Sequence, residues 1–332
     1  MIQVQPDERQ RANASRLDRL NLLLKHTWTH NPFYQNKWRR AGMTPASLDC
    51  IEALQAYPFT ARAELIEDHA AHPPLGTNLA CAITQFKRHF HSSGTTGTPM
   101  LWADTPRTWE WVLQCSAQLH AIAGIQKQDV VLMFADLAST SGPWVILEGA
   151  RRLGCTCLTC SSHDTQEARR WLSAMHPTVL IGKVEPLLTF ARAIRAQGLR
   201  PSVAGVERVI LTGRGGSLDS AARKELEECW DAPCFDRYGL TEAGSVAAEC
   251  VAHTGALHVL DHEFIAEVIN PSSLEPLDDG NVGELVLTNL GRIDRPIIRY
   301  RTGDKGLLRR EHRCACGHLG TVIPGGIQGR LR

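Results

Sequence analysis

The feature that most constrains the fold is a regular alternation of helix-like and strand-like segments between residues 107 and 211. Amphipathic spacing predicts helices at 107–123, 143–153, 165–174 and 185–197. Short apolar runs suited to buried strands lie between them, at 129–134, 155–159, 178–181 and 206–211. Such alternation predicts βαβ units around a largely parallel sheet.

The two flanks have a different character. Leucines at three- and four-residue spacing predict an amphipathic helix over 15–25, and Asn31-Pro32 breaks that pattern. In the last third, β-like segments at 257–259, 264–269 and 283–288 are separated by turn-rich stretches. We therefore expect a smaller antiparallel β subdomain after the parallel core.

Composition excludes several classes of protein. Hydrophobic residues at 43% and charged residues at 21% of 332 are typical of a globular protein, and Lys+Arg 36 against Asp+Glu 35 leaves no field suited to nucleic acid or an anionic membrane. The first ten residues lack the order of a secretory signal, and no apolar run is long enough to cross a bilayer, so we expect a cytoplasmic location. Eleven cysteines, an odd number, favour reduced thiols and a metal site over a disulfide framework.

The stretch His91–Met100 is a candidate phosphate loop. Gly94 and Gly97 allow close backbone approach, and four hydroxyl side chains add donors, from Ser92, Ser93, Thr95 and Thr96. The loop differs from that of the common nucleoside triphosphatases, because no lysine follows its second glycine. The alternative is an ordinary Ser/Thr/Gly surface loop.

Two further motifs follow, Asp-Arg-Tyr-Gly-Leu-Thr-Glu at 236–242 and Arg-Tyr-Arg-Thr-Gly-Asp at 299–304. With the phosphate loop, and in this order, they resemble the core motifs of the adenylate-forming superfamily of acyl-CoA ligases. The segments 31–34 and 58–60 resemble the N-terminal helices of its phenylacetate-CoA ligase branch. The resemblance implies an α/β large domain with parallel βαβ sheets, divided into a helical segment packed on the body at 1–80, a nucleotide- and acyl-binding core at 81–250 and a β subdomain at 251–330.

The resemblance also implies an activity. Such enzymes use ATP and Mg²⁺ to convert a carboxylic acid, here of aryl or arylacetic type, to an acyl-adenylate with release of pyrophosphate. The acyl group then passes to CoA or to a carrier-protein thiol. Gly329-Arg330 resembles the start of the hinge to a C-terminal lid, and the sequence ends at Arg332, so we expect the lid to be absent. A lidless subunit with a separate lid domain, an amine acceptor and a non-catalytic binding module stay open as alternatives, as does a homo-oligomer.

By the same resemblance, the phosphate loop holds the β- and γ-phosphates through its hydroxyls and the amides of Gly94 and Gly97. The resemblance also implies that Thr95, Thr241 and Glu242 are catalytic residues. Thr98 stands where many relatives carry lysine. One phosphate-facing charge is therefore missing or supplied from elsewhere.

The second and third motifs supply the remaining nucleotide contacts. Glu242 is assigned to Mg²⁺, because a hard cation bridging phosphates needs a carboxylate oxygen. The resemblance implies that Tyr238 stacks on adenine, that Thr241 contacts the α-phosphate and that Asp304 accepts hydrogen bonds from the ribose hydroxyls. The nucleotide-binding set is completed by Asp236, Gly239 and Arg330 and by the glycine-rich turn with Gly213, Arg214 and Gly215.

A separate set of residues has the composition of a zinc site. Cys250, His258, Cys314 and Cys316 offer three thiolates and one imidazole, which satisfy tetrahedral zinc, and we expect a structural site. Competing ligands are His253, His262, His312 and His318, and unliganded buried cysteines are the alternative. The cysteines at 155, 157 and 160 do not converge in an extended strand, since the first two face one side and the third the other.

The acyl pocket is placed by the resemblance along residues 134–148 and 213–217. Glu148 either faces that pocket, where it would pair with a substrate amine, or pairs with a neighbouring arginine such as Arg151 or Arg152.

Overall fold

The structure is a computed structural model that describes residues 6–92, 99–137, 140–198, 201–213 and 220–331. Its α-helices are α1 Pro6–His30, α2 Pro32–Arg40, α3 Arg62–Ala71, α4 Pro106–Ile122, α5 Ser141–Leu153, α6 Thr165–Met175, α7 Val184–Arg195 and α8 Ser220–Trp230. Short 3₁₀ turns lie at η1 Ile51–Ala56, η2 Ile83–Gln85 and η3 Pro201–Ala204.

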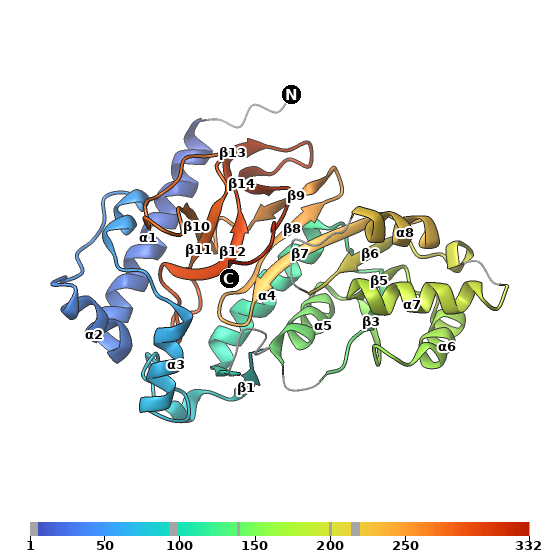
Figure 1. The fold of residues 1–332 in the computed structure, drawn as a ribbon, viewed down its shortest axis with the longest axis horizontal. Helices are drawn as coiled ribbons and strands as arrows, with labels where there is room; N and C mark the ends of the chain where they lie inside the picture. Colours follow the sequence, from blue (N-terminus) through green and yellow to red (C-terminus); the bar gives the residue numbers. More distant parts are fainter. Residues whose placement is uncertain (1–5, 93–98, 138–139, 199–200, 214–219, 332) are drawn as a thin grey trace.

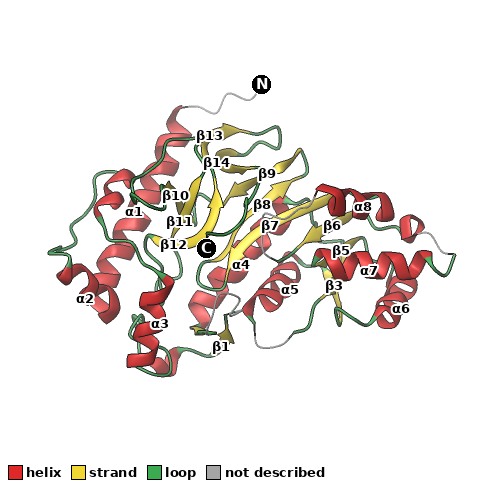
Figure 2. Cartoon of the chain, in the orientation of Figure 1, coloured by secondary structure: helices red, strands yellow, loops and turns green. Residues whose placement is uncertain are grey.

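The strands are more numerous in the second half of the chain (Figures 1 and 2). They are β1 Arg88–His91, β2 Leu101–Asp104, β3 Val130–Phe134, β4 Thr156–Cys160, β5 Val179–Gly182, β6 Arg208–Leu211, β7 Cys234–Leu240, β8 Gly244–Cys250, β9 His253–Val259, β10 Phe264–Ile269, β11 Gly283–Asn289, β12 Tyr300–Gly306, β13 Arg309–Arg313 and β14 Leu319–Pro324.

The largest sheet is mixed and has the strand order β13-β14-β9-β8-β7-β6-β5-β3-β4. Strands β6, β5, β3 and β4 pair in parallel, as the alternating sequence pattern predicts, and β7 joins them in parallel beside β6. The pairs from β7 through β13 are antiparallel. The carboxyl ends of the parallel strands therefore meet at one edge of the sheet, where ligands bind in open α/β folds. This edge holds the candidate site.

The parallel strands are covered on both faces, which follows from their continuous apolar sequences. Alternate residues enter different cores: Leu180 and Val209 pack with α7 and α8 residues, whereas Ile181 and Ile210 pack with α5 residues. The three cysteines of this region divide in the predicted way, since Cys155 and Cys157 contribute to the second core and Cys160 to the first.

Helix starts agree with local chemistry. The Asn31 side chain accepts a hydrogen bond from the Tyr34 amide, and Pro32 opens α2, so Asn31-Pro32 ends α1 and begins the next helix. Thr105 caps α4 in the same manner by accepting from the Thr108 amide. Helix α1 extends farther than the leucine pattern predicted, because polar residues continue it on both sides.

A second sheet, β10-β11-β12, is antiparallel and lies beside α1 and α2 (Figure 1). Leu20 and Trp38 pack with Ile265 and Ile298 in one cluster, which also contains Tyr34 and Tyr57. The strands β9, β13 and β14 extend the large sheet, and β8 pairs with β9, with Cys250 opposite His253.

The proposed domain boundaries stay predictions. Within the described residues, no helix is both long enough and apolar enough to span a membrane.

Candidate active site

The candidate phosphate loop leaves the β1–β2 hairpin through a fixed stem. The Ser92 amide donates to the Met100 carbonyl at 2.8 Å, and the Met100 amide donates back to Ser92 Oγ at 2.9 Å. Six residues of the loop, Ser93, Gly94, Thr95, Thr96, Gly97 and Thr98, lie outside the described residues. Ser92 is therefore the one predicted phosphate ligand of this loop whose position the structure gives.

Glu242 is buried in the turn between β7 and β8, and its carboxylate is paired with an arginine from the N-terminal segment. Arg62 Nη1 donates to Glu242 Oε1, and Arg62 Nη2 donates to Ser92 Oγ at 2.9 Å. The structure thus brings the phosphate-loop stem and the predicted magnesium ligand to opposite sides of one guanidinium. Sequence reasoning missed Arg62, because a single arginine at the start of a helix carries no distinctive pattern.

A second arginine holds the turn that carries Thr241 and Glu242. Arg292 Nη1 donates to the carbonyls of Thr241 at 2.7 Å and Glu242 at 3.0 Å. The same guanidinium is fully buried and forms an ion pair with Asp104 of β2, with Nε 2.8 Å from Oδ1. Because a buried charge is stable only when it is paired, this arrangement fixes the turn relative to the hairpin below the phosphate loop.

Asp304 and Tyr238 lie together, as two residues of one ribose and adenine site should. The Tyr238 hydroxyl donates to Asp304 Oδ2 at 2.9 Å, and Arg330 Nε donates to Oδ1 at 2.8 Å. Burial raises the pKa of Tyr238 well above its usual range, so its hydroxyl remains a neutral donor. The structure therefore places three of the predicted nucleotide residues, on β7, β12 and the last described segment, in direct contact.

The hydroxyl of Tyr300 links this group to Glu242. It forms a hydrogen bond with Arg62, and the charges of Glu242 and Arg330 both act on it. Burial, and then the charge of Glu242, raise its pKa. The arginine–glutamate pair and the Asp304 group are thus parts of one continuous polar site.

Asp236 lies on β7 opposite Leu211, next to the end of β6 where Gly213 follows. Burial, and then the nearby charge of Glu249, raise its pKa to about 7. Arg214 and Gly215 lie outside the described residues. Gly239 has a steric role, because a Cβ there would lie 2.6 Å from the Gly244 carbonyl oxygen across the β7–β8 turn.

The four predicted zinc ligands converge. Their donor atoms all lie within 4.8 Å of one another, with 3.6 Å between the sulfurs of Cys250 and Cys314 and 3.4 Å between Cys316 Sγ and His258 Nε2. Tetrahedral Zn–S bonds of about 2.3 Å would separate two sulfurs by about 3.8 Å, so the cluster has the dimensions of a zinc site. Of the competing histidines, His318 packs its ring against that of His258, and His253 lies beside His312.

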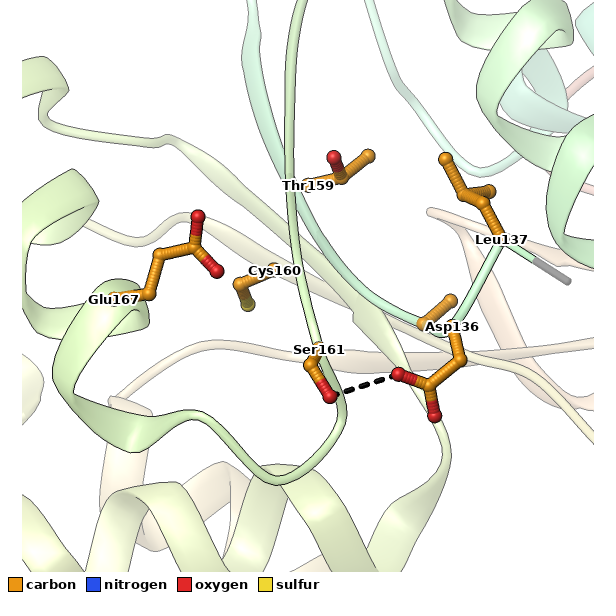
Figure 3. Close-up of a pocket in the computed structure, with 7 residues that line it drawn as sticks. Asp136, Leu137, Thr159, Cys160, Ser161 and Glu167 are labelled. Atoms are coloured by element: carbon orange, nitrogen blue, oxygen red, sulfur yellow. Dashed lines mark hydrogen bonds between the residues drawn. The ribbon is translucent and has the colours of Figure 1, made fainter.

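A polar pocket opens at the carboxyl ends of β3 and β4 (Figure 3). Ala135, Asp136 and Leu137 of its lining come from the segment predicted to form the acyl pocket, and Asp136 accepts a hydrogen bond from Ser161 at 2.8 Å. The acyl assignment stays a prediction.

Glu148 does not use the arginines expected for it. Its carboxylate accepts from Arg88 Nη1 at 3.1 Å and from Trp109 Nε1 at 3.0 Å, whereas Arg152 pairs with Glu110. The reason is the β1–β2 hairpin, which brings Arg88 over the Trp109 ring and next to α5. Glu148 is thus satisfied within the fold.

The phosphate-loop stem, the buried carboxylate after β7 and the carboxylate–tyrosine pair lie together in an α/β fold, as their assignment to one nucleotide site predicts. In agreement, the family described as AMP-binding enzyme matches residues 73–291, and the chain belongs to this family.

Relatives within the family are acyl-CoA ligases. The chain is 31% identical over 293 residues to the phenylacetate-coenzyme A ligase of Pseudomonas putida, which covers 87% of this chain and 64% of that protein. The corresponding ligase of Thermus thermophilus is 29% identical, covering 97% of this chain and 71% of its own. A crystal structure of 2-hydroxyisobutyryl-CoA ligase with 2-HIB-AMP superposes with a TM-score of 0.90 at 25% identity, covering 99% of this chain and 69% of that one. The chain thus spans about two thirds of the length of these relatives.

Proposed function

We propose that the protein uses ATP to convert a carboxylic acid to an acyl-adenylate, with release of pyrophosphate. The observation that carries the proposal is the convergence of Ser92, Glu242 and Asp304 from three separated motifs on one polar site. Such chemistry depends on positioning the triphosphate and neutralising its charge, and a rigid set of charged groups performs that task.

Each residue has a defined part in this proposal. Ser92 donates to the phosphate chain, and Asp304 accepts from the two ribose hydroxyls after exchanging its present partners, Tyr238 and Arg330. Glu242 is the carboxylate available to a Mg²⁺ ion, which when bound would offset the negative charge of the phosphates. Its donor chemistry fits a hard cation, and Arg62 now supplies the positive charge beside it.

The acid and the acceptor are proposals drawn from relatives. Two of these proteins are named for phenylacetate and one for 2-hydroxyisobutyrate, and all three are CoA ligases. We propose an aryl or arylacetic acid as substrate and CoA as acceptor, with a carrier-protein thiol as the other candidate.

ATP–pyrophosphate exchange tests the proposal. The protein is assayed with aryl, arylacetic and short aliphatic acids, including phenylacetate and 2-hydroxyisobutyrate, and each acid is tested with and without CoA. We expect acid-dependent exchange with one class and thioester formation when CoA is added. Binding of ATP by calorimetry without exchange for any acid would contradict an adenylating function.

We further propose that Cys250, His258, Cys314 and Cys316 hold a structural zinc ion. Support comes from three sulfurs and one imidazole within 4.8 Å and from free thiols at all three cysteines. The ion would join the turn between β13 and β14 to β8 and β9.

A further inference from the structure

We propose that Arg62 is a phosphate-binding residue of this site. Before the nucleotide binds, its guanidinium occupies the position beside Glu242 that a metal ion would take. The inference rests on the proposed function and adds a residue that none of the three motifs contains. It also accounts for the missing positive charge at Thr98 of the phosphate loop.

The first step concerns the backbone, which fixes where Arg62 stands. Thr60 pairs with β12: its amide donates to the Arg299 carbonyl at 2.9 Å, and its carbonyl accepts from the Arg301 amide at 2.9 Å. Helix α3 begins two residues later, with the Ala61 amide bonded to the Glu64 side chain at 2.7 Å. The third motif thus holds the base of Arg62 in place.

The second step concerns the head group. Its two terminal nitrogens point to different motifs, one to Glu242 Oε1 and one to Ser92 Oγ, and Tyr300 of the third motif is a further partner. A guanidinium presents several donors in a rigid fork, which suits phosphate oxygens as well as carboxylates. The Arg62 side chain is 22% exposed to solvent, whereas the Glu242 side chain is 7% exposed. The arginine is therefore the member of the pair that a ligand can reach.

The third step concerns charge. Glu242 is buried, and a buried carboxylate requires a positive partner. A magnesium ion bound with ATP would supply that charge, and Arg62 would then be able to contact the phosphate chain beside Ser92. The same arginine would neutralise Glu242 in the nucleotide-free site and would bind phosphate when ATP and the metal ion are present.

The alternative is that Arg62 only neutralises Glu242 and touches no ligand. Removing Glu242 separates the two cases, because an arginine with that sole role has no effect on ATP once the carboxylate is gone. ATP affinity is therefore measured by calorimetry in EDTA for wild type, Arg62→Ala, Glu242→Gln and the double variant. Adenosine serves as a second ligand that lacks phosphates, and Arg40→Ala, an exposed arginine of α2, is the matched control.

With the metal chelated, Arg62 of the wild type stays paired with Glu242, so the decisive comparison is made in the Glu242→Gln background. There we expect Arg62→Ala to weaken ATP binding at least about tenfold, as loss of a charge-assisted contact does. Adenosine affinity should stay within about twofold, which also shows that the variants are folded, and Arg40→Ala should match wild type. Unchanged ATP affinity when Arg62 is removed from the Glu242→Gln protein would overturn the proposal. Because no acid is present, this readout is separate from pyrophosphate exchange, so failure of the proposed adenylation and failure of the Arg62 assignment can be told apart.

Discussion

Two carboxylates predicted to face the nucleotide already have cationic or hydroxyl partners in the structure. Glu242 is bound by Arg62, and Asp304 by Tyr238 and Arg330. Such pairing follows from the cost of burying an isolated charge. It also means that ligand binding must exchange partners at these residues, so substitutions there should affect binding and chemistry more than folding.

At Glu242, replacement by Gln keeps the shape and removes the charge. We expect Mg²⁺-dependent pyrophosphate exchange to fall by at least about 100-fold, because an electrostatic contact to a charge in the transition state is lost. Steady-state exchange rates across a Mg²⁺ titration provide the measurement. The exposed Glu52→Gln is the control, and activity equal to wild type in Glu242→Gln would remove the magnesium assignment.

Asp236 predicts a pH dependence of stability. Its pKa is raised to about 7 in the folded protein, so between roughly pH 4 and pH 7 the folded state binds more protons than the unfolded state. Stability from this group therefore falls as pH rises through that window. Asp236→Asn should be more stable than wild type at pH 8, by at most about 4 kcal/mol, and the gain should shrink towards pH 5. Urea unfolding of the nucleotide-free proteins at both pH values tests this, and a gain that grows on acidification would contradict it.

At the scale of elements, strand ends and turns build the site while the helices mainly cover the sheet. The β7–β8 turn carries Glu242, and Arg292 fixes it from the segment after β11. The β13–β14 turn carries two of the proposed zinc ligands, and its strands pair with each other and, through β14, with β9. A metal ion there would add a cross-link between this turn and the strands β8 and β9.

Replacing Cys314 and Cys316 by Ser should remove zinc and lower the midpoint of thermal unfolding by several degrees. About 1 kcal/mol corresponds to roughly 2–4 °C for domains of 150–250 residues, and structural zinc contributes to folding directly. Metal content by mass spectrometry and differential scanning fluorimetry test this together. Cys50→Ser, at an exposed thiol, is the control. A metal-free wild type with the same midpoint as the double variant would refute the site.

Across the whole molecule, the N-terminal segment is an integral part of the body. Arg299 pairs with Glu267 and donates to the carbonyls of Gln55 at 2.6 Å and Tyr57 at 2.7 Å, which ties η1 to the antiparallel sheet. Trp38 is fully buried in the cluster that joins α1 and α2 to β10. Since Arg62 belongs to this segment, the packing of the segment and the active site are coupled.

Trp38→Ala should therefore destabilise the protein by about 3–5 kcal/mol, the usual cost of removing a large buried side chain. Denaturant unfolding followed by circular dichroism is the measurement, with Leu22→Ala on the exposed face of α1 as a control that should change stability by less than about 0.5 kcal/mol. A loss below about 1 kcal/mol for Trp38→Ala would show that the N-terminal cluster is not part of the cooperative unit.

The parallel half of the fold was predictable because each strand and helix there has its own periodicity. Segments 107–123 and 206–211 needed only their local apolar pattern, and α4 and β6 formed close to the predicted bounds. The strands β7, β8 and β12 to β14 were not predicted, since motif residues, glycines and charged residues interrupt their alternation. Their register depends on partners far along the chain.

The sequence by itself determined the types of residue that the site needs, because carboxylates, hydroxyls, glycines and thiols are selected by the chemistry of phosphate, ribose and metal. Only the tertiary structure decided which of them meet. It placed Arg62 between Ser92 and Glu242 and paired Glu148 with Arg88. The physical reason is that such contacts join residues tens to hundreds of positions apart, and their geometry follows from sheet order and packing, which no local pattern encodes.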